Sequence, residues 1–274
     1  DCDERTFHLD PHDAESRLGD AGTIMPTHLF GAPCAAERFE ALARRSGAAL
    51  VFDAAHGFGA RRQGRAVGGW GDAEVFSLSP TKVLTAGEGG LVATPHDDVA
   101  LSLRNGRDYG NSGEDEDQFI GLNARMSELH AALAIEALAD IDTRLTRRRA
   151  LGHGYRKHID DIPGLRSQAV DDGDEVTYKA CSIVVEPEFG IDRDVLVAAL
   201  RAEGVETRCY FSPPVHRQPP YASSDGPDLP RTTDLANRVV TLPIWPEMDD
   251  TVVDTVAEVL ARLDAGEDVA LVSD

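Results

Sequence analysis

Lys82 is the first residue to consider for catalysis, because the chain contains only two other lysines, Lys157 and Lys179. It lies in the segment Ser-Pro-Thr-Lys-Val-Leu-Thr-Ala-Gly-Glu-Gly-Gly at 79–90. A lysine amine becomes nucleophilic when a desolvated site or a nearby cation disfavours its ammonium form, and it then condenses with aldehydes to imines. Three glycines of this segment allow the backbone to approach a ligand closely. We predict that Lys82 is an imine-forming residue rather than an ordinary loop lysine.

Asp53 is the second candidate, because it ends the apolar run Ala48–Phe52. A carboxylate in this place either forms a turn before Ala54-Ala55 or faces a ligand. The residues alone leave both alternatives open.

The first half of the chain alternates short apolar runs with helical patterns, which predicts α/β layering with strands buried on both faces. Ala35–Arg45 is predicted as a helix that Gly47 closes. Ligands gather at the carboxyl ends of strands in such sheets, so the segments to search are His28, Asp53–His56 and Ser77–Lys82. The predicted strands are Thr23–Thr27, Ala48–Phe52, Val75–Leu78 and Gly90–Thr94.

The second half begins with apolar residues at helical spacing from Met126, which run into the basic cluster Arg147–Arg149. This pattern predicts a long helix that joins two domains. A smaller α+β domain follows it, so the expected division is a large α/β domain at 1–124, a connecting helix at 125–162 and the small domain at 163–274. The elements predicted in the small domain are strands at Val176–Val185 and Val205–Tyr210 and helices at Asp192–Glu203 and Asp250–Leu263.

The composition restricts the possible partners. The formal net charge of −21 over 274 residues disfavours nucleic acid and anionic membranes, since a phosphate surface would be repelled. No apolar stretch reaches membrane-spanning length and the first residues are charged, so we expect a cytoplasmic protein. The acidic, lysine-poor surface resembles that of halophilic proteins; an acidic protein from a GC-rich genome is the alternative. Four scattered cysteines predict reduced thiols and no metal site.

Several ordered motifs resemble one known family over nearly the whole chain. Val-Phe-Asp-Ala-Ala-His-Gly-Phe-Gly-Ala at 51–60, Gly-Asp-Ala-Glu-Val-Phe-Ser-Leu-Ser-Pro-Thr-Lys at 71–82 and Gly-Glu-Gly-Gly at 87–90 resemble the cofactor site of the DegT/DnrJ/EryC1/StrS aminotransferases. These are pyridoxal-phosphate-dependent enzymes of fold type I, the aspartate aminotransferase-like fold. The similarity extends through His-Leu-Phe-Gly at 28–31, Gly-Leu-Asn-Ala-Arg-Met-Ser-Glu at 121–128, Tyr-Phe-Ser-Pro-Pro-Val-His-Arg-Gln-Pro-Pro-Tyr at 210–221 and Leu-Pro-Ile-Trp-Pro-Glu-Met at 242–248.

The resemblance implies a role for each matching residue of the cofactor site. Lys82 would form the imine with pyridoxal 5′-phosphate and act as general acid and base, while Asp53 would keep the pyridine nitrogen protonated, which makes the ring an electron sink. His56 would lie beside the ring. Ser77 would donate to the phosphate, unless it simply ends a strand. Asn123 would reach the phosphate site of a neighbouring subunit, unless it caps the long helix.

The substrate residues are less specific. His28 either orients substrate or cofactor or is a satisfied interior group, and the segment at 210–221 makes Tyr210 and His216 candidates for sugar contacts. Its prolines would also suit a rigid turn. The acidic run at 114–117 is predicted to be a solvated loop.

Two departures from the family pattern concern packing and extent. Ala124 replaces an aromatic residue common between the family's Asn and Arg. The first ten residues resemble a stretch well inside a family member, so we expect the chain to lack the amino-terminal segment that supplies a phosphate-binding loop and a stacking aromatic residue.

The function implied is transfer of an amino group, with glutamate as the expected donor, to a nucleotide-linked keto-sugar by a homodimer. A lysine at position 82 disfavours the family's dehydratase branch. Two alternatives stay open: an aminotransferase or aminodehydratase acting on a cyclitol or a cyclic aromatic precursor, and a non-catalytic fragment or partner subunit.

Overall fold

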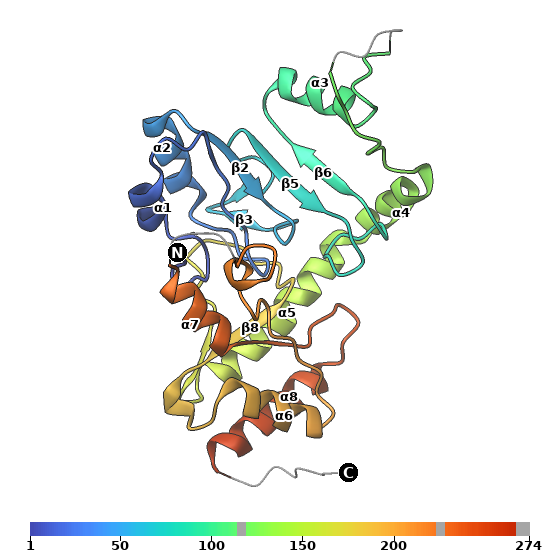
Figure 1. Ribbon diagram of the computed structural model, residues 1–274. Helices are drawn as coiled ribbons and strands as arrows, with labels where there is room; N and C mark the ends of the chain where they lie inside the picture. Colours follow the sequence, from blue (N-terminus) through green and yellow to red (C-terminus); the bar gives the residue numbers. More distant parts are fainter. Residues whose placement is uncertain (114–118, 223–227, 267–274) are drawn as a thin grey trace.

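The computed structural model describes residues 1–113, 119–222 and 228–266, in which two sheets are joined by helices (Figure 1). The strands are β1 (Thr23–Ile24), β2 (Ala49–Asp53), β3 (Arg61–Arg62), β4 (Arg65–Ala66), β5 (Ala73–Ser77), β6 (Gly90–Ala93), β7 (Leu165–Ser167), β8 (Cys181–Val185) and β9 (Val239–Leu242). The helices are α1 (Pro11–Arg17), α2 (Ala36–Ser46), α3 (Asp97–Gly106), α4 (Glu128–Ala139), α5 (Ile141–Ile159), α6 (Arg193–Ala202), α7 (Pro230–Arg238) and α8 (Asp250–Asp264), with short 3₁₀ turns η1 (Pro187–Phe189) and η2 (Val215–Arg217).

The first sheet has the strand order β1-β2-β5-β6, parallel from β1 to β5 and closed by an antiparallel β6. Asp53 pairs with Val75, so the carboxyl ends of β2 and β5 are neighbours. The predicted strands are therefore confirmed, although β1 stops at Ile24. The chain passes through Pro26, which has no N–H for a ladder, and Thr27 rejoins β2 by a single bridge.

The two faces of this sheet differ in burial. Helix α2 covers one face, where its Phe39 packs with Leu50 and Phe52. On the other face Val75 is 41% exposed and Met25 65% exposed. The prediction of burial on both faces is therefore wrong for the described residues.

The connection between the two sheets is formed by two helices rather than the single long helix that the spacing predicts. Asp140 ends α4 and precedes α5, with φ −103° and ψ 8°, outside the helical range. Aspartate competes with the helix backbone for hydrogen bonds and favours helix ends, which accounts for the break. Helix α4 has no buried residue, whereas α5 buries six, including Leu151 and Tyr155.

The second sheet, β7-β8-β9, is antiparallel and packs with α5, α6 and α8 around one core. The predicted helices are confirmed within one residue at each end. The predicted strand at Val176–Val185 begins only at Cys181, because residues 177–180 bond to Phe30 and Gly31 of the first half instead. The predicted strand at Val205–Tyr210 is wrong, since only Arg208 pairs with β9, by a bridge to Thr241.

Two further observations bear on the predicted partners. Across the described residues, no helix has both the length and the apolar character needed to cross a membrane, and no group of three or more metal-binding side chains comes together. All four cysteines are unpaired, as predicted.

Candidate active site

Lys82 lies in a closed loop that follows β5. Leu78 donates its N–H to the carbonyl of Gly89 at 2.9 Å, and Ala86 donates back to Leu78 at 2.9 Å. Val83, Leu84 and Ala86 are buried, while Lys82 itself is half-buried. The loop is thus anchored by its apolar residues and presents the lysine.

The glycines of this loop also allow close contacts within the chain. Gly89 has φ +137°, and a Cβ there would lie 2.6 Å from the Cε of Met126. A Cβ on Gly87, with φ +81°, would lie 3.3 Å from the ring of His130. These glycines therefore let the Lys82 loop approach the start of α4.

Asp53 is held in place by its backbone. Its N–H donates to Pro26 and its carbonyl accepts from His28, both at 2.9 Å. One side-chain oxygen accepts from the N–H of Ala55 at 2.9 Å. The other has no hydrogen-bond or ion-pair partner among the described residues, so the carboxylate keeps one free acceptor.

A cavity of about 290 Å³ opens on the less covered face of the first sheet. Asp53 and Ser77 line it together, since both follow the strand alternation of Val51 and Val75. The Ser77 hydroxyl lies 3.3 Å from that of Ser79. The structure thus brings two predicted cofactor residues to the rim of one concavity.

Lys82 and Asp53 interact electrostatically. Burial lowers the pKa of Lys82, and the nearby Asp53 carboxylate opposes that shift. Near neutral pH, a larger fraction of Lys82 is therefore in the neutral amine form than is the case for an exposed lysine.

His56 lies against Phe30, with ring centroids 6.3 Å apart and the planes 18° from parallel. Its Nδ1 accepts the Phe30 N–H at 3.2 Å, which assigns the proton to Nε2. Burial, followed by the positive charges of Lys179 and Lys82, lowers the pKa of His56 to about 3. The ring is therefore a neutral donor beside the two lysines.

Lys179 joins this group and was not predicted. Its side chain is 9% exposed, and its Nζ lies 5.1 Å from the centre of the Tyr210 ring. The pKa of Lys179 is lowered to about 8, mainly by burial and to a smaller extent by nearby cations. The scarcity of lysine was the signal that could have found it, because the same scarcity singles out Lys82.

His28 lies in the interior. Its ring is 0% exposed, stacks on Phe52 at 5.1 Å, and places Nε2 3.3 Å from the carboxylate of Glu74. Its Nδ1 accepts from the N–H of Cys34. Any influence of His28 on a substrate must therefore pass through its neighbours.

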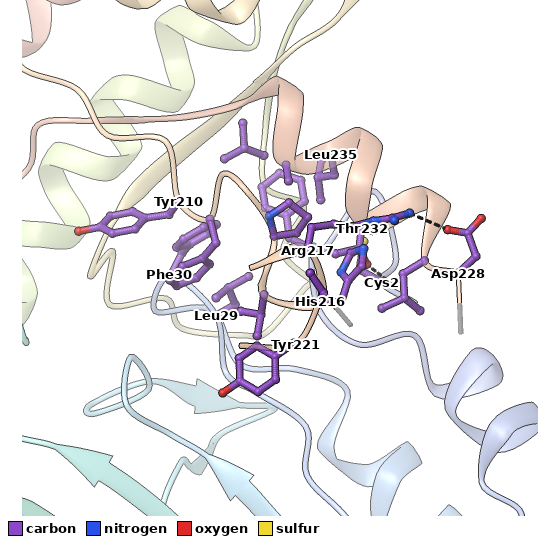
Figure 2. A pocket seen from close by; sticks show the side chains of 18 residues that line it. Cys2, Leu29, Phe30, Tyr210, His216, Arg217, Tyr221, Asp228, Thr232 and Leu235 are labelled. Carbon is purple, nitrogen blue, oxygen red and sulfur yellow. Dashed lines mark hydrogen bonds and ion pairs between the residues drawn. The ribbon is translucent and has the colours of Figure 1, made fainter. Parts of the chain in front are cut away.

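Tyr210 and His216 line a second, larger cavity of about 860 Å³, whose wall is mostly apolar. Figure 2 shows Tyr210 and Phe30 at one end of this cavity and Asp228 at the other. The Nε2 of His216 lies 3.0 Å from the hydroxyl of Thr233. Phe30, which also lines this cavity, contacts His56 on its other side.

Asn123 is exposed, and its backbone pairs with Asp108 rather than with any residue of the smaller cavity. The acidic run at 114–117 lies outside the described residues.

Comparison with known proteins identifies relatives along nearly all of the chain. The model of the DegT/DnrJ/EryC1/StrS aminotransferase family matches residues 1–261. The erythromycin biosynthesis sensory transduction protein EryC1 of Saccharopolyspora erythraea is 34% identical over 94% of this chain and 69% of its own length. A dTDP-3-amino-3,4,6-trideoxy-alpha-D-glucose transaminase of Streptomyces venezuelae is 33% identical over 88% of this chain and 64% of its own length.

Solved structures show the same similarity. DesI, crystallised in the presence of its TDP-sugar product, matches with a TM-score of 0.89 and 34% identity over 97% of this chain and 69% of that chain. S. venezuelae DesV in complex with a ketimine intermediate matches with a TM-score of 0.90 and 30% identity over 96% of this chain and 71% of that one. The chain thus spans about two thirds of the length of these relatives.

Proposed function

The chain belongs to the DegT/DnrJ/EryC1/StrS aminotransferase family, whose members depend on pyridoxal phosphate, and from this we propose that it transfers an amino group to a nucleotide-linked keto-sugar. The proposed donor is an amino acid, with glutamate as the first to test. Relatives named as dTDP-sugar and UDP-sugar transaminases support the substrate class. The observation that carries the proposal is the electrostatic interaction of Lys82, in the loop after β5, with Asp53 at the end of the neighbouring parallel strand β2.

The residues around the smaller cavity fit pyridoxal phosphate. The free oxygen of Asp53 suits a protonated ring nitrogen, and Ser77 supplies a hydroxyl for the phosphate. His56 offers a neutral N–H beside Lys82. When bound, the cofactor supplies an aldehyde for amines and a ring that withdraws electrons from the reacting carbon.

Lys82 is proposed as the covalent anchor and as the group that moves the proton. Its Nζ can accept a proton from a substrate carbon only while it is neutral, and burial favours that form. Asp53 limits the shift, so the amine can also return the proton. The buried residues of its loop fix the backbone of Lys82 while it does so.

We propose a two-fold homodimer in which Asn123 completes the phosphate site of its partner. Two features support it: Asn123 is exposed, and α4, five residues further on, has several large apolar side chains that are exposed. These are Leu129 (80%), Leu133 (56%), Ile135 (72%) and Leu138 (48%). Clustered exposed apolar side chains mark contact surfaces. We also propose a division into parts at 1–124, 125–162 and 163–274.

The test is a transfer assay on the purified chain with pyridoxal phosphate. Glutamate and a dTDP-linked keto-sugar should yield 2-oxoglutarate and an amino sugar in equal amounts, measured by coupled oxidation and mass spectrometry. A cyclic ketone without a nucleotide is the comparison acceptor. Turnover of the cyclic ketone alone would overturn the proposed substrate class. Absence of 2-oxoglutarate would exclude glutamate as the donor, and absence of amino transfer to every acceptor from each amino-acid donor would overturn the proposed activity.

A further inference from the structure

Positive charge concentrates around Lys179, although the chain as a whole carries −21. Three cations act on the Lys179 ammonium: Lys82, Arg148 and Arg208. No carboxylate forms an ion pair with Lys179 or Arg208 among the described residues, whereas most other arginines there have such a partner. Lys179 and Arg208 are thus two interacting cations without a paired carboxylate, which in so acidic a chain favours the binding of an anion.

The backbone fixes Lys179 firmly. The N–H groups of Thr177 and Ala180 donate to the carbonyls of Gly31 and Phe30, at 3.0 and 3.1 Å. Gly31 has φ +99°, and a Cβ there would lie 2.7 Å from the backbone N of Lys179. Only glycine allows this approach, so the lysine is positioned by two segments about 150 residues apart in sequence.

The ammonium itself has little to compensate its burial. The ring of Tyr210, 5.1 Å from Nζ, is its only described partner, and a ring face replaces little of the hydration of an ammonium. Arg148 is committed elsewhere, because it donates to the carbonyl of Tyr178 at 2.8 Å and feels the charge of Glu247. Lys179 and the exposed Arg208 therefore remain available to a ligand.

We propose that Lys179, with Arg208 beside it, binds an anionic oxygen group of the substrate. The shared chemistry is a carboxylate or phosphate oxygen that accepts charge-assisted hydrogen bonds. The source of the anion follows from the proposed function, on which this step rests. The anionic group is then either the carboxylate of the amino donor or the diphosphate of the nucleotide. Tyr210 forms the side of this anion site.

Binding should depend on the charge of Lys179. Its pKa of about 8 leaves the ammonium mostly protonated at pH 7 and mostly neutral at pH 9, so anion affinity falls as pH rises through this range. The other groups facing it are Lys82, His56 and the two arginines, and His56 is already neutral at pH 7. A bound anion, in turn, favours the protonated lysine.

The experiment is calorimetric titration of the whole chain, without pyridoxal phosphate, using inorganic pyrophosphate in one arm and 2-oxoglutarate in the other at constant ionic strength. Lys179→Met removes the charge, Lys179→Arg keeps it, and Lys157→Met changes an exposed lysine on α5 as the control. Loss of one charge-assisted hydrogen bond should weaken binding in Lys179→Met on the order of tenfold to a hundredfold. The arm that loses affinity identifies the source of the anion.

The result expected is weaker binding in Lys179→Met and little change in the other two variants. Equal binding by wild type and Lys179→Met in both arms, or no binding by wild type in either, would overturn the proposal. If Lys179→Met does not fold, wild-type affinity that is equal at pH 7 and pH 9 would overturn it instead. Anion binding without any amino transfer would count against the proposed function alone.

Discussion

The two faces of the first sheet differ in what their side chains do. On the face under α2, Phe52 and Glu74 are both 0% exposed and serve packing and internal hydrogen bonds. On the opposite face, Asp53 of β2 and Ser77 of β5 border a cavity. One residue along the same strand thus separates a buried structural position from one that borders the cavity.

His28 follows the first pattern although it lies at the carboxyl edge of the sheet, just after the bridge of Thr27 to Asp53. Its ring lies between Phe52 and Glu74, and its backbone N–H donates to the Asp53 carbonyl. The interior face therefore supports the open face from behind. Substitutions on the open face should lower turnover with little loss of stability. Substitutions on the interior face should lower stability with little direct effect on turnover.

The largest effect is expected for Lys82→Ala, which removes the proposed anchor from the open side. Loss of proton transfer alone should lower turnover on the order of 10²–10⁴-fold, with the melting temperature nearly unchanged. Borohydride reduction in the presence of pyridoxal phosphate, followed by peptide mass analysis, should label Lys82 in the wild type and no residue in the variant. Label on Lys179 or Lys157 would assign the anchor elsewhere.

The next effect concerns the interior face. One oxygen of Glu74 accepts the N–H groups of Gly68 and Trp70, at 2.7 and 2.6 Å. Glu74→Ala leaves both donors without an acceptor and should lower the free energy of unfolding by about 2–5 kcal/mol in urea titration. Glu74→Gln keeps an acceptor and should lose less.

Val75→Ala is the matched control for the interior face, because Val75 is the next residue of the same strand and points to the open face. It should cost under about 1 kcal/mol. If Val75→Ala proves as destabilising as Glu74→Ala, the two faces are not distinguished by stability.

Much of this comparison can be predicted from the sequence. The apolar strands, the chemistry of Lys82 and the end of a strand at Asp53 all depend on local patterns. The burial of Glu74 could also have been predicted, because Glu74 lies on the same side of its strand as the buried Phe76. The scarcity of lysine could have singled out Lys179, but its position beside Lys82 could not be predicted, since it depends on backbone contacts with Gly31, far away in sequence. The helix break at Asp140 was not predicted, because a single polar residue does not disturb the helical spacing of the apolar residues on either side of it.

A smaller effect is expected at Asn123, which lies on neither face in its own chain. If it completes a partner's phosphate site, Asn123→Ala should weaken cofactor binding by about 1.5–3 kcal/mol, the value of one hydrogen bond to a charged group. Mixing this variant with Lys82→Ala should restore turnover through hybrid sites that hold both intact residues. A mixture no more active than its two components would rule out shared sites.

A pH-dependent effect separates His56, beside the lysines, from exposed histidines. Its pKa of about 3 lies below the ordinary value of 6.5, so the folded chain keeps the ring neutral while the unfolded chain takes up a proton below about pH 6.5. The stability this contributes is fully present above pH 6.5 and is lost as pH falls toward 3. The difference in unfolding free energy between wild type and His56→Gln should therefore shrink on acidification, by up to about 1.4 kcal/mol per pH unit. Urea titrations of both proteins from pH 7 to pH 4.5 measure it, with His153→Gln as the exposed control, and parallel curves for wild type and His56→Gln would show that His56 is not held neutral by burial beside Lys179 and Lys82.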